Sequence, residues 1–218
     1  MNRSVLIVLS LALVGCQTPP TPPPTKPVSL SSVFRLAKLE EIDSAIGQAI
    51  AAGKAPGAVV RIESGRAVYQ KTFGDKAAKP ERSPMTADTI FDAASLTKVI
   101  ATAPAIALLI EQGKLGLDDR VEKWIPGFKK NGKGAVTIRH LLTHTSGLRP
   151  GLSPRPEWSG VATAIAKAKA EPLTEQPDTK FIYSDINFIL LGEIVRLVSG
   201  ERLDLFVSKN IFQPLGMN

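Results

Sequence analysis

The chain has 218 residues, of which 44% are hydrophobic, with a mean hydropathy of +0.06 and a formal net charge of +7. This composition permits a buried core and argues against general disorder, and the length allows one large domain or two small ones. The positive charge is scattered and is not interleaved with aromatic residues, so the sequence does not predict a nucleic-acid-binding surface.

The N-terminus has the pattern of a bacterial lipoprotein signal. Arg3 precedes an apolar run over residues 5–14, which is too short for a comfortable transmembrane helix, and Cys16 follows directly after a small residue. Residues 13–16 (LVGC) resemble a lipobox, whose cysteine is lipidated and becomes the first residue of the mature protein. We therefore expect a membrane anchor at Cys16, the alternative being a plain signal peptide with an incidental cysteine. Because Gln17 follows, resemblance to Gram-negative lipoproteins favours the outer membrane of the cell envelope, facing the periplasm.

The sequence after the cysteine changes composition twice. Residues 17–30 are rich in proline and threonine, and proline removes backbone donors, so this stretch is predicted to be a semi-extended linker. The apolar periodicity of a folded domain begins near residue 31. The predicted organisation is therefore a signal and lipidated cysteine over 1–16, a linker over 17–30 and a folded domain over 31–218.

The predicted elements of the folded part begin with a helix and a hairpin. Apolar spacing predicts an amphipathic helix over 34–52, and runs rich in β-branched residues predict strands over 58–62 and 67–73. An almost wholly apolar helix is predicted over 95–112, largely buried and kinked at Pro104. Further helices are predicted over 118–125, 137–143, 160–170, 185–198 and 203–210, with a surface loop over 149–159.

Ser95 and Lys98 are the first candidates for chemistry. Residues three apart on a helix lie on one face, one turn from each other, so the amine of Lys98 can reach the hydroxyl of Ser95. A lysine deprotonated by burial could accept the proton of the serine and activate it as a nucleophile. The alternative is a helix-capping serine beside an ordinary lysine. A lysine on so apolar a helix needs a reason, because burying its charge is costly.

Tyr183 is the next candidate, at the start of the helix predicted over 185–198. A phenol placed there could shuttle a proton between Lys98, Ser95 and a leaving group. A tyrosine that merely packs in the core is the alternative.

Together these motifs resemble the β-lactamase/transpeptidase family, and within it the group of class C β-lactamases, DD-peptidases and related esterases. The resemblance implies an α/β fold in which an antiparallel sheet is flanked by helices, with a helical subdomain. It also implies that Ser95 is the nucleophile, Lys98 the general base and Tyr183 the proton relay. The matching segments, in order, are residues 56–58 (PGA), 91–98 (FDAASLTK), 140–148 (HLLTHTSGL), 181–185 (FIYSD) and 214–217 (PLGM).

Two departures from the family pattern bear on activity. Where the family often has an asparagine that contacts the substrate, this chain has Asp185, and a carboxylate there could keep Lys98 protonated and raise its pKa. The family's third motif, a Lys/His-Thr-Gly-type strand, normally lies beyond Asn218. We therefore expect that the C-terminal strands of the domain are missing from this chain and that the chain alone is unstable or barely active.

The sequence thus predicts a serine hydrolase that forms an acyl-enzyme with small esters, cell-wall D-Ala peptides or β-lactams, ranked in that order because of Asp185. The alternative is a non-catalytic, truncated envelope lipoprotein that serves as a binding module. His140 and His144 share a helical face, but no carboxylate or cysteine cluster accompanies them, so no metal site is predicted. No cofactor motif is present, and the sequence does not indicate an oligomeric state.

Overall fold

The structure is a computed structural model that describes residues 28–77 and 80–217. Cys16 and the whole predicted signal therefore lie outside the described residues. The chain divides into two compact units, the first ending at Phe91 and the second running from Asp92 onward. The division falls inside the region predicted as one domain, and each unit is described by itself below.

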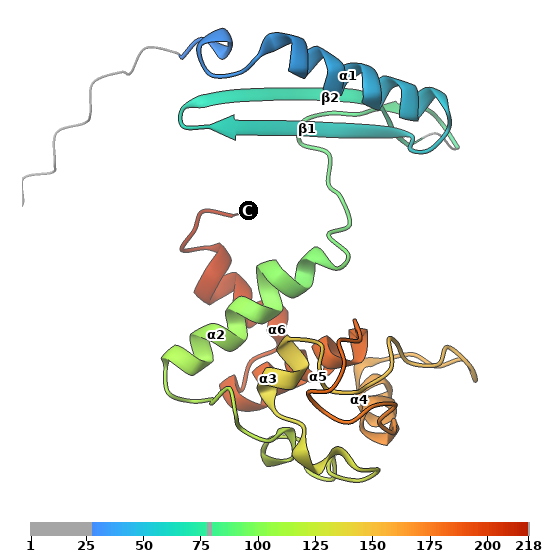
Figure 1. Cartoon of the computed structure of the whole chain (residues 1–218), viewed down its shortest axis with the longest axis vertical. Helices are drawn as coiled ribbons and strands as arrows, with labels where there is room; N and C mark the ends of the chain where they lie inside the picture. The colour runs from blue at the N-terminus through green and yellow to red at the C-terminus, as the bar shows by residue number, and fades with distance from the viewer. Residues whose placement is uncertain (1–27, 78–79, 218) are drawn as a thin grey trace, which may run out of the picture. The chain divides into compact units, whose positions relative to one another are not determined.

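The described residues of the first unit, 28–77 and 80–91, form a helix and an antiparallel sheet (Figure 1). A short 3₁₀ turn, η1 (Leu30–Ser32), precedes α1 (Leu36–Ala51). The strands β1 (Gly57–Ser64), β2 (Ala67–Ala77) and β3 (Ser83–Pro84) follow in the order β1-β2-β3. The helix predicted over 34–52 and the predicted hairpin are both confirmed.

Polar contacts connect α1 to β2 in this unit. Asp43 of α1 accepts hydrogen bonds from the hydroxyl of Tyr69 and, at 2.5 Å, from the amine of Lys71. The hydrogen bond to Asp43 raises the pKa of Tyr69 to about 12, because the neutral phenol is the form that can donate to a carboxylate. Polar groups of α1 and β2 therefore hold the helix against the hairpin.

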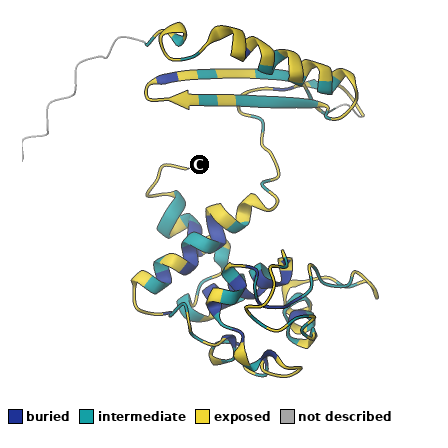
Figure 2. Cartoon of the chain, viewed as in Figure 1, coloured by how far each residue is buried: buried dark blue, intermediate teal, exposed yellow. Residues whose placement is uncertain are grey.

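The second unit is helical. Its main helices are α2 (Ala103–Glu111), α3 (Ile138–Leu142), α4 (Val161–Ala170), α5 (Asp185–Ser199) and α6 (Leu203–Val207). The buried residues of this unit form one cluster, to which α2, α3, α5 and α6 and the segments between α2 and α4 all contribute (Figure 2). The central helix α5 is apolar on its inner face, with Ile186, Leu190, Leu191, Ile194 and Val195 all fully buried.

The predicted helix over 95–112 differs in detail from expectation. Residues Lys98–Thr102 form a π-helical turn, η2, in which the N–H of Ala103 donates to the carbonyl of Lys98, five residues earlier. Pro104 follows at once, and its ring has no N–H and clashes with the carbonyl four residues before it, so the wider turn accommodates it. The prediction of a largely buried helix is wrong for its first turns, because Leu96, Val99 and Ile100 are exposed.

Helices are present where they were predicted over 137–143, 160–170 and 185–198, as α3, α4 and α5. The stretch predicted over 118–125 contains only a 3₁₀ turn, η3 (Val121–Lys123), and the last helix divides into α6 and a second π turn, η5 (Ser208–Phe212). The loop predicted over 149–159 contains no helix or strand. In the described part of the chain, no helix combines the length and apolar character that crossing a membrane requires.

Gly147 fixes the path of the chain after α3. Its φ is 79°, and a Cβ built on it would lie 2.0 Å from the carbonyl oxygen of Glu175. Its own carbonyl accepts a hydrogen bond from the N–H of Thr174. Only glycine permits both the left-handed backbone and this close approach.

We expect Gly147→Ala to lower the free energy of unfolding by about 2 kcal/mol or more, because it adds backbone strain and a collision with the Glu175 carbonyl. Gly151→Ala is the matched control, since no atom lies within 4 Å of a Cβ built there. Urea unfolding followed by circular dichroism measures both changes. Equal stabilities for the two variants would contradict this account of Gly147.

Candidate active site

Ser95 and Lys98 meet at the first turn of the helix that leads into α2. The Nζ of Lys98 lies 3.1 Å from the Oγ of Ser95, within hydrogen-bonding distance. Ser95 is exposed, whereas the Lys98 side chain is only 13% exposed. The three-residue spacing therefore produces the predicted contact, with the hydroxyl accessible to a substrate and the amine sheltered behind it.

A strained residue precedes the serine. Ala94 has a φ of 43°, and its N–H donates to Oδ1 of Asp92 at 2.8 Å. Non-glycine residues adopt positive φ at an energetic cost, and such strain is found where a side chain must be presented. The N–H of Ser95, which follows, donates to no acceptor among the described residues. Within the described residues, the amide of Ser95 is thus left to face a ligand beside the exposed side chain of Ser95.

Tyr183 reaches the same place from an extended segment just before α5. The N–H of Ile182 donates to the carbonyl of His144, and the N–H of Asp185 donates to the carbonyl of Pro150. These two bonds fix the backbone on either side of Tyr183. The ring of Tyr183 lies 5.0 Å from the Nζ of Lys98, so the structure brings the predicted hydroxyl, amine and phenol together.

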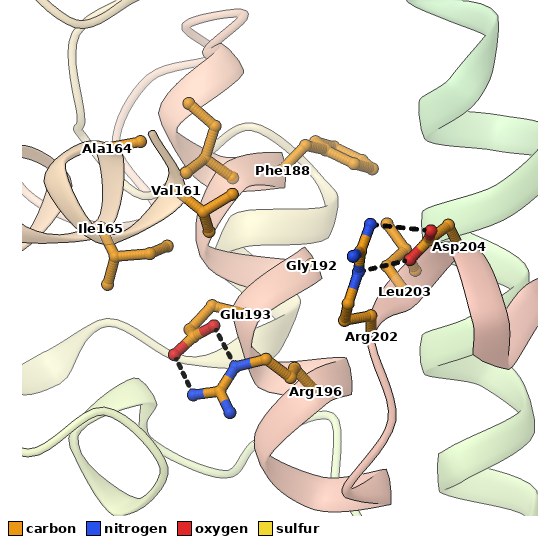
Figure 3. A pocket seen from close by; sticks show the side chains of 11 residues that line it. Val161, Ala164, Ile165, Phe188, Gly192, Glu193, Arg196, Arg202, Leu203 and Asp204 are labelled. Carbon is orange, nitrogen blue, oxygen red and sulfur yellow. Dashed lines mark hydrogen bonds and ion pairs between the residues drawn. The ribbon is translucent and has the colours of Figure 1, made fainter. Parts of the chain in front are cut away.

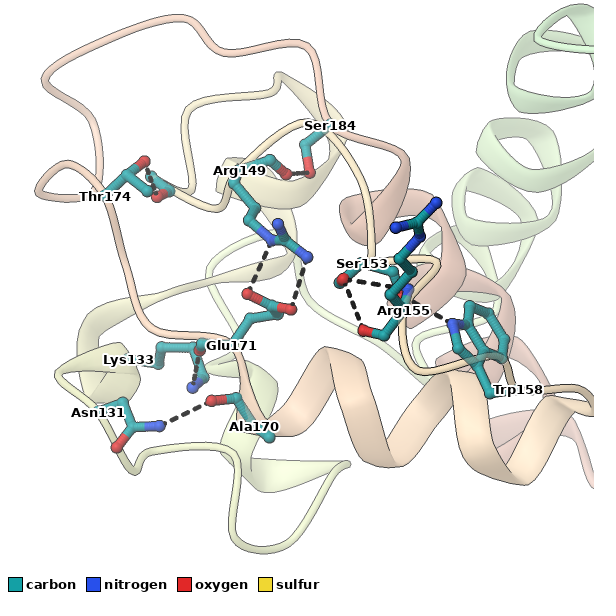
Figure 4. Close-up of polar contacts among 11 residues, drawn as sticks. Asn131, Lys133, Arg149, Ser153, Arg155, Trp158, Ala170, Glu171, Thr174 and Ser184 are labelled. Carbon is teal, nitrogen blue, oxygen red and sulfur yellow. Dashed lines mark hydrogen bonds and ion pairs between the residues drawn. The ribbon is translucent and has the colours of Figure 1, made fainter.

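The loop before α4 supports this segment (Figure 4). The hydroxyl of Ser184 donates to the carbonyl of Arg149 at 2.6 Å, and the guanidinium of Arg149 pairs with Glu171 at 2.8 Å. The indole N–H of Trp158 donates to the carbonyl of Ser153, which closes the outer part of the loop. The loop is therefore held by its own hydrogen bonds while it holds the segment that carries Tyr183.

Asp185 forms an ion pair with Lys98. Its Oδ1 lies 2.6 Å from the Nζ of Lys98, and its side chain remains 59% exposed. Burial is the largest single influence on the pKa of Lys98 and lowers it. The hydrogen bond to Asp185 and the neighbouring Tyr183 outweigh burial, so the pKa of Lys98 is raised above its ordinary value. Lys98 is therefore a cation at neutral pH, as the sequence suggested for a carboxylate at this position.

The pKa of Tyr183 moves in the opposite direction. Hydrogen bonding with Ser95 and then with Lys98 lowers it below the ordinary value of a phenol, while the charge of Asp185 opposes this shift. A neighbouring cation stabilises a phenolate, which explains the direction. The site thus combines a lysine that holds its proton with a tyrosine that loses one more easily.

His144 is a further functional candidate. The sequence placed it only on a helical face shared with His140, but α3 ends at Leu142 and His144 lies beyond it with a φ of 59°. Its Nδ1 accepts a hydrogen bond from the N–H of Ser184 at 3.0 Å, and its ring lies 4.5 Å from that of Tyr183 and 5.2 Å from that of Phe188. Burial, followed by the charge of Lys98, lowers the pKa of His144, so the ring is neutral and can accept. No sequence pattern could show this role, because it depends on contacts across about forty residues.

The second histidine has a different function in the fold. Nδ1 of His140 accepts from the N–H of Thr137, and the hydroxyl of Thr137 accepts from the N–H of His140, which caps α3 at its N-terminus. Within residues 28–77 and 80–217, no group of three or more histidine, cysteine or acidic side chains is arranged to hold a metal ion.

Comparison with known proteins shows what this chain is similar to. Residues 42–218 match the family model described as Beta-lactamase. A protein of Escherichia coli (strain K12) named "Putative D-alanyl-D-alanine carboxypeptidase" is 33% identical to the chain. That match covers 100% of this chain and 55% of the relative.

Solved structures give the same result. The octameric penicillin-binding protein homologue from Pyrococcus abyssi is 34% identical with a TM-score of 0.71, over 85% of this chain and 44% of that one. A class C β-lactamase in complex with cefoxitin is 27% identical with a TM-score of 0.72, over 84% of this chain and 51% of that one. The chain spans about half the length of the proteins it matches.

We expect Asp185→Asn to make Ser95 reactive at lower pH. The carboxylate raises the pKa of both Lys98 and Tyr183, so its removal lowers both, whichever group accepts the serine proton. Below that pKa the rate follows the deprotonated fraction, so phosphonylation of Ser95 by a fluorophosphonate at pH 7 should become about tenfold faster. Rates measured between pH 5 and 10 test this.

The control for this experiment is Asp118→Asn, which neutralises an exposed carboxylate paired with Arg139. Its pH profile should match that of the unmodified chain. A profile for Asp185→Asn that coincides with that of the control would show that the ion pair does not govern the site.

Proposed function

The chain belongs to the β-lactamase family and has its fold, and from this premise we propose that it is a serine hydrolase that forms an acyl-enzyme on Ser95. The observation that carries the proposal is the convergence of three groups: the Oγ of Ser95, the Nζ of Lys98 and the phenol of Tyr183. A nucleophile, a cation and a titratable hydroxyl at one place are the parts that acyl transfer requires.

In the proposed reaction, the Oγ of Ser95 attacks the carbonyl carbon of the substrate while its proton passes to the oxygen of Tyr183. The ammonium of Lys98 stabilises the phenolate that receives this proton, and the free N–H of Ser95 donates to the oxyanion. Tyr183 then returns the proton to the leaving group as the bond to it breaks. A water molecule hydrolyses the ester on Ser95 and restores the serine.

This assignment changes the role predicted for Lys98. The sequence favoured a lysine made neutral by burial, acting as the base itself. The ion pair with Asp185 supports a charged lysine instead, because an ammonium cannot accept a second proton. The lowered pKa of Tyr183 supports the phenol as the acceptor. In this proposal Lys98 acts electrostatically on Tyr183 and Ser95.

Small esters are the substrates that we rank first, ahead of D-Ala peptides and β-lactams. The exposed carboxylate of Asp185 lies beside the nucleophile and would repel the carboxylates that D-Ala-terminated peptides and penicillins carry. A neutral ester meets no such repulsion. The relative named as a D-alanyl-D-alanine carboxypeptidase and the β-lactamase bound to cefoxitin support the other two classes.

Active-site labelling tests the proposed function. We expect a fluorophosphonate, and more weakly a fluorescent penicillin, to add once to the purified chain, with the adduct on Ser95 by peptide mass spectrometry. Ser95→Ala should reduce labelling to background, at least a hundredfold, because the nucleophile is lost. Circular dichroism confirms that both proteins are folded. No adduct on a folded chain would instead favour the non-catalytic binding module.

For localisation, we propose that the protein is anchored in the bacterial envelope through lipid on Cys16, and that its outer-membrane destination follows from Gln17. The lipobox-like residues 13–16 support this. Radiolabelled palmitate should enter the protein expressed in a Gram-negative host, and the protein should sediment with membranes. Cys16→Ser should abolish both, because a thioether to lipid needs the thiol. A labelled Cys16→Ser protein would contradict the anchor.

A further inference from the structure

An apolar groove of about 430 Å³ lies between α4, α5 and α6 in the second unit (Figure 3). Val161, Ala164 and Ile165 line it from α4, at the spacing that places side chains on one helix face. Phe188 and Gly192 line it from α5. Its volume lies in the range of small-molecule sites, which are concave and mostly apolar.

The groove shares lining residues with a hollow at the candidate active site. Phe188, Ile189 and Leu203 line the groove and also line this neighbouring hollow of about 310 Å³. That second hollow contains Lys98 and Asp185. The ring of Phe188 lies 5.8 Å from the Nζ of Lys98 and so stands where the two meet. A molecule whose reacting group faces Ser95 can therefore extend along α5 into the groove.

Gly192 lines the groove from inside α5, and the presence of a glycine at this position is not explained by helix stability. A glycine inside a helix destabilises it by about 1 kcal/mol relative to alanine. No close approach requires it here, because a Cβ built on Gly192 would lie 3.5 Å from Leu203, an ordinary contact distance. What the glycine does provide is open space on the face of α5 that lines the groove.

The charged groups of the groove are paired with each other. Glu193 pairs with Arg196 at 2.7 Å, and Arg202 pairs with Asp204 at 2.9 Å. Both pairs are visible at the edge of the groove in Figure 3. No net charge is left on these four side chains to attract an ionic group, so the surface that remains for a ligand is hydrocarbon.

We propose that this groove binds the straight alkyl chain of an ester substrate while its carbonyl faces Ser95. This inference rests on the proposed function and specifies its substrate as an ester with an apolar chain of several carbons. Burying a methylene contributes about 0.8 kcal/mol, so affinity should rise two- to fourfold for each methylene that enters the groove.

Binding can be tested without catalysis. The full chain, labelled at isoleucine methyl groups, is titrated with n-butanol, n-hexanol and n-octanol and followed by NMR. We expect the methyl signals of Ile165 and Ile189 to shift, with affinity rising along the series. In Gly192→Leu the added side chain fills the groove, so the gain with chain length should fall at least fivefold between butanol and octanol.

Gly47→Leu is the matched control, because it adds the same side chain to an exposed glycine inside α1, where no atom lies within 4 Å of a Cβ. It should bind the alcohols as the unmodified chain does. Affinity independent of chain length, or shifts confined to other isoleucines, would overturn the inference. So would an unchanged chain-length gain in Gly192→Leu.

Hydrolysis of 4-nitrophenyl acetate, hexanoate and octanoate separates this inference from the proposed function. Rising kcat/KM with chain length in the unmodified chain, flattened in Gly192→Leu, supports both. If the affinity for alcohols rises with chain length but Ser95 does not react, the alkyl-binding groove is supported and the proposed hydrolase is rejected. If Ser95 hydrolyses the esters but the affinity for alcohols does not depend on chain length, the proposed hydrolase is supported and the alkyl-binding groove is rejected.

Discussion

The candidate site depends on the pairing of residues 144–150 with residues 182–185. His144, Arg149 and Pro150 accept backbone and side-chain hydrogen bonds from the extended segment before α5 and so hold it in place. These bonds fix where α5 begins, and therefore place Tyr183 and Asp185 beside Lys98. Ser95 and Lys98 meet through local helix spacing alone. Without the pairing, however, neither the phenol of Tyr183 nor the carboxylate of Asp185 would lie beside them. Residues 144–148 (HTSGL) thus help to form the site, because they hold the segment that carries Tyr183.

Electrostatics at the site follow from the burial of one ammonium group. A lysine with 13% of its side chain exposed is stable only if its charge is compensated. Asp185 supplies a carboxylate at 2.6 Å, and the rings of Tyr183 and Phe188 face the cation at 5.0 and 5.8 Å. The compensation that makes the lysine tolerable also keeps it protonated. Tyr183 then becomes the group whose proton affinity the site lowers.

Several features of the fold and of the candidate site could be predicted from the sequence, because they depend on the spacing of residues that are close in the chain. The interval from Ser95 to Lys98 is one helical turn, and apolar periodicity located α1 and α5 to within a few residues. The effect of Asp185 on the pKa of Lys98 was also predictable, because it requires only that a carboxylate lies beside the amine. The contact of Tyr183 with Lys98 could not be derived from spacing, because it joins segments far apart in the chain, and only the family resemblance implied it.

Other features could not be predicted from the sequence, because they depend on tertiary packing. The π turn at η2 depends on how the chain accommodates Pro104, and a kink was as consistent with the sequence. The exposure of Leu96 and Val99 depends on which elements pack around the helix, which hydrophobicity alone does not specify. The role of His144 needs a tertiary contact to Ser184 and a ring stack on Tyr183. None of these leaves a periodic signal.

Departures from local preference provide evidence about the site that is independent of resemblance. Four non-glycine residues in the described chain have positive φ, and three of them, Asn131, His144 and Asp178, are of types enriched in this conformation. Ala94 is not, and it immediately precedes Ser95. Gly192 weakens α5 in the groove that adjoins the hollow lined by Lys98, and the π turn begins at Lys98 itself. Natural sequences violate local rules mainly where function requires it. The departures at Ala94, Lys98 and Gly192 lie in or next to the hollow that Lys98 lines, and this supports a chemical role for that site on physical grounds alone.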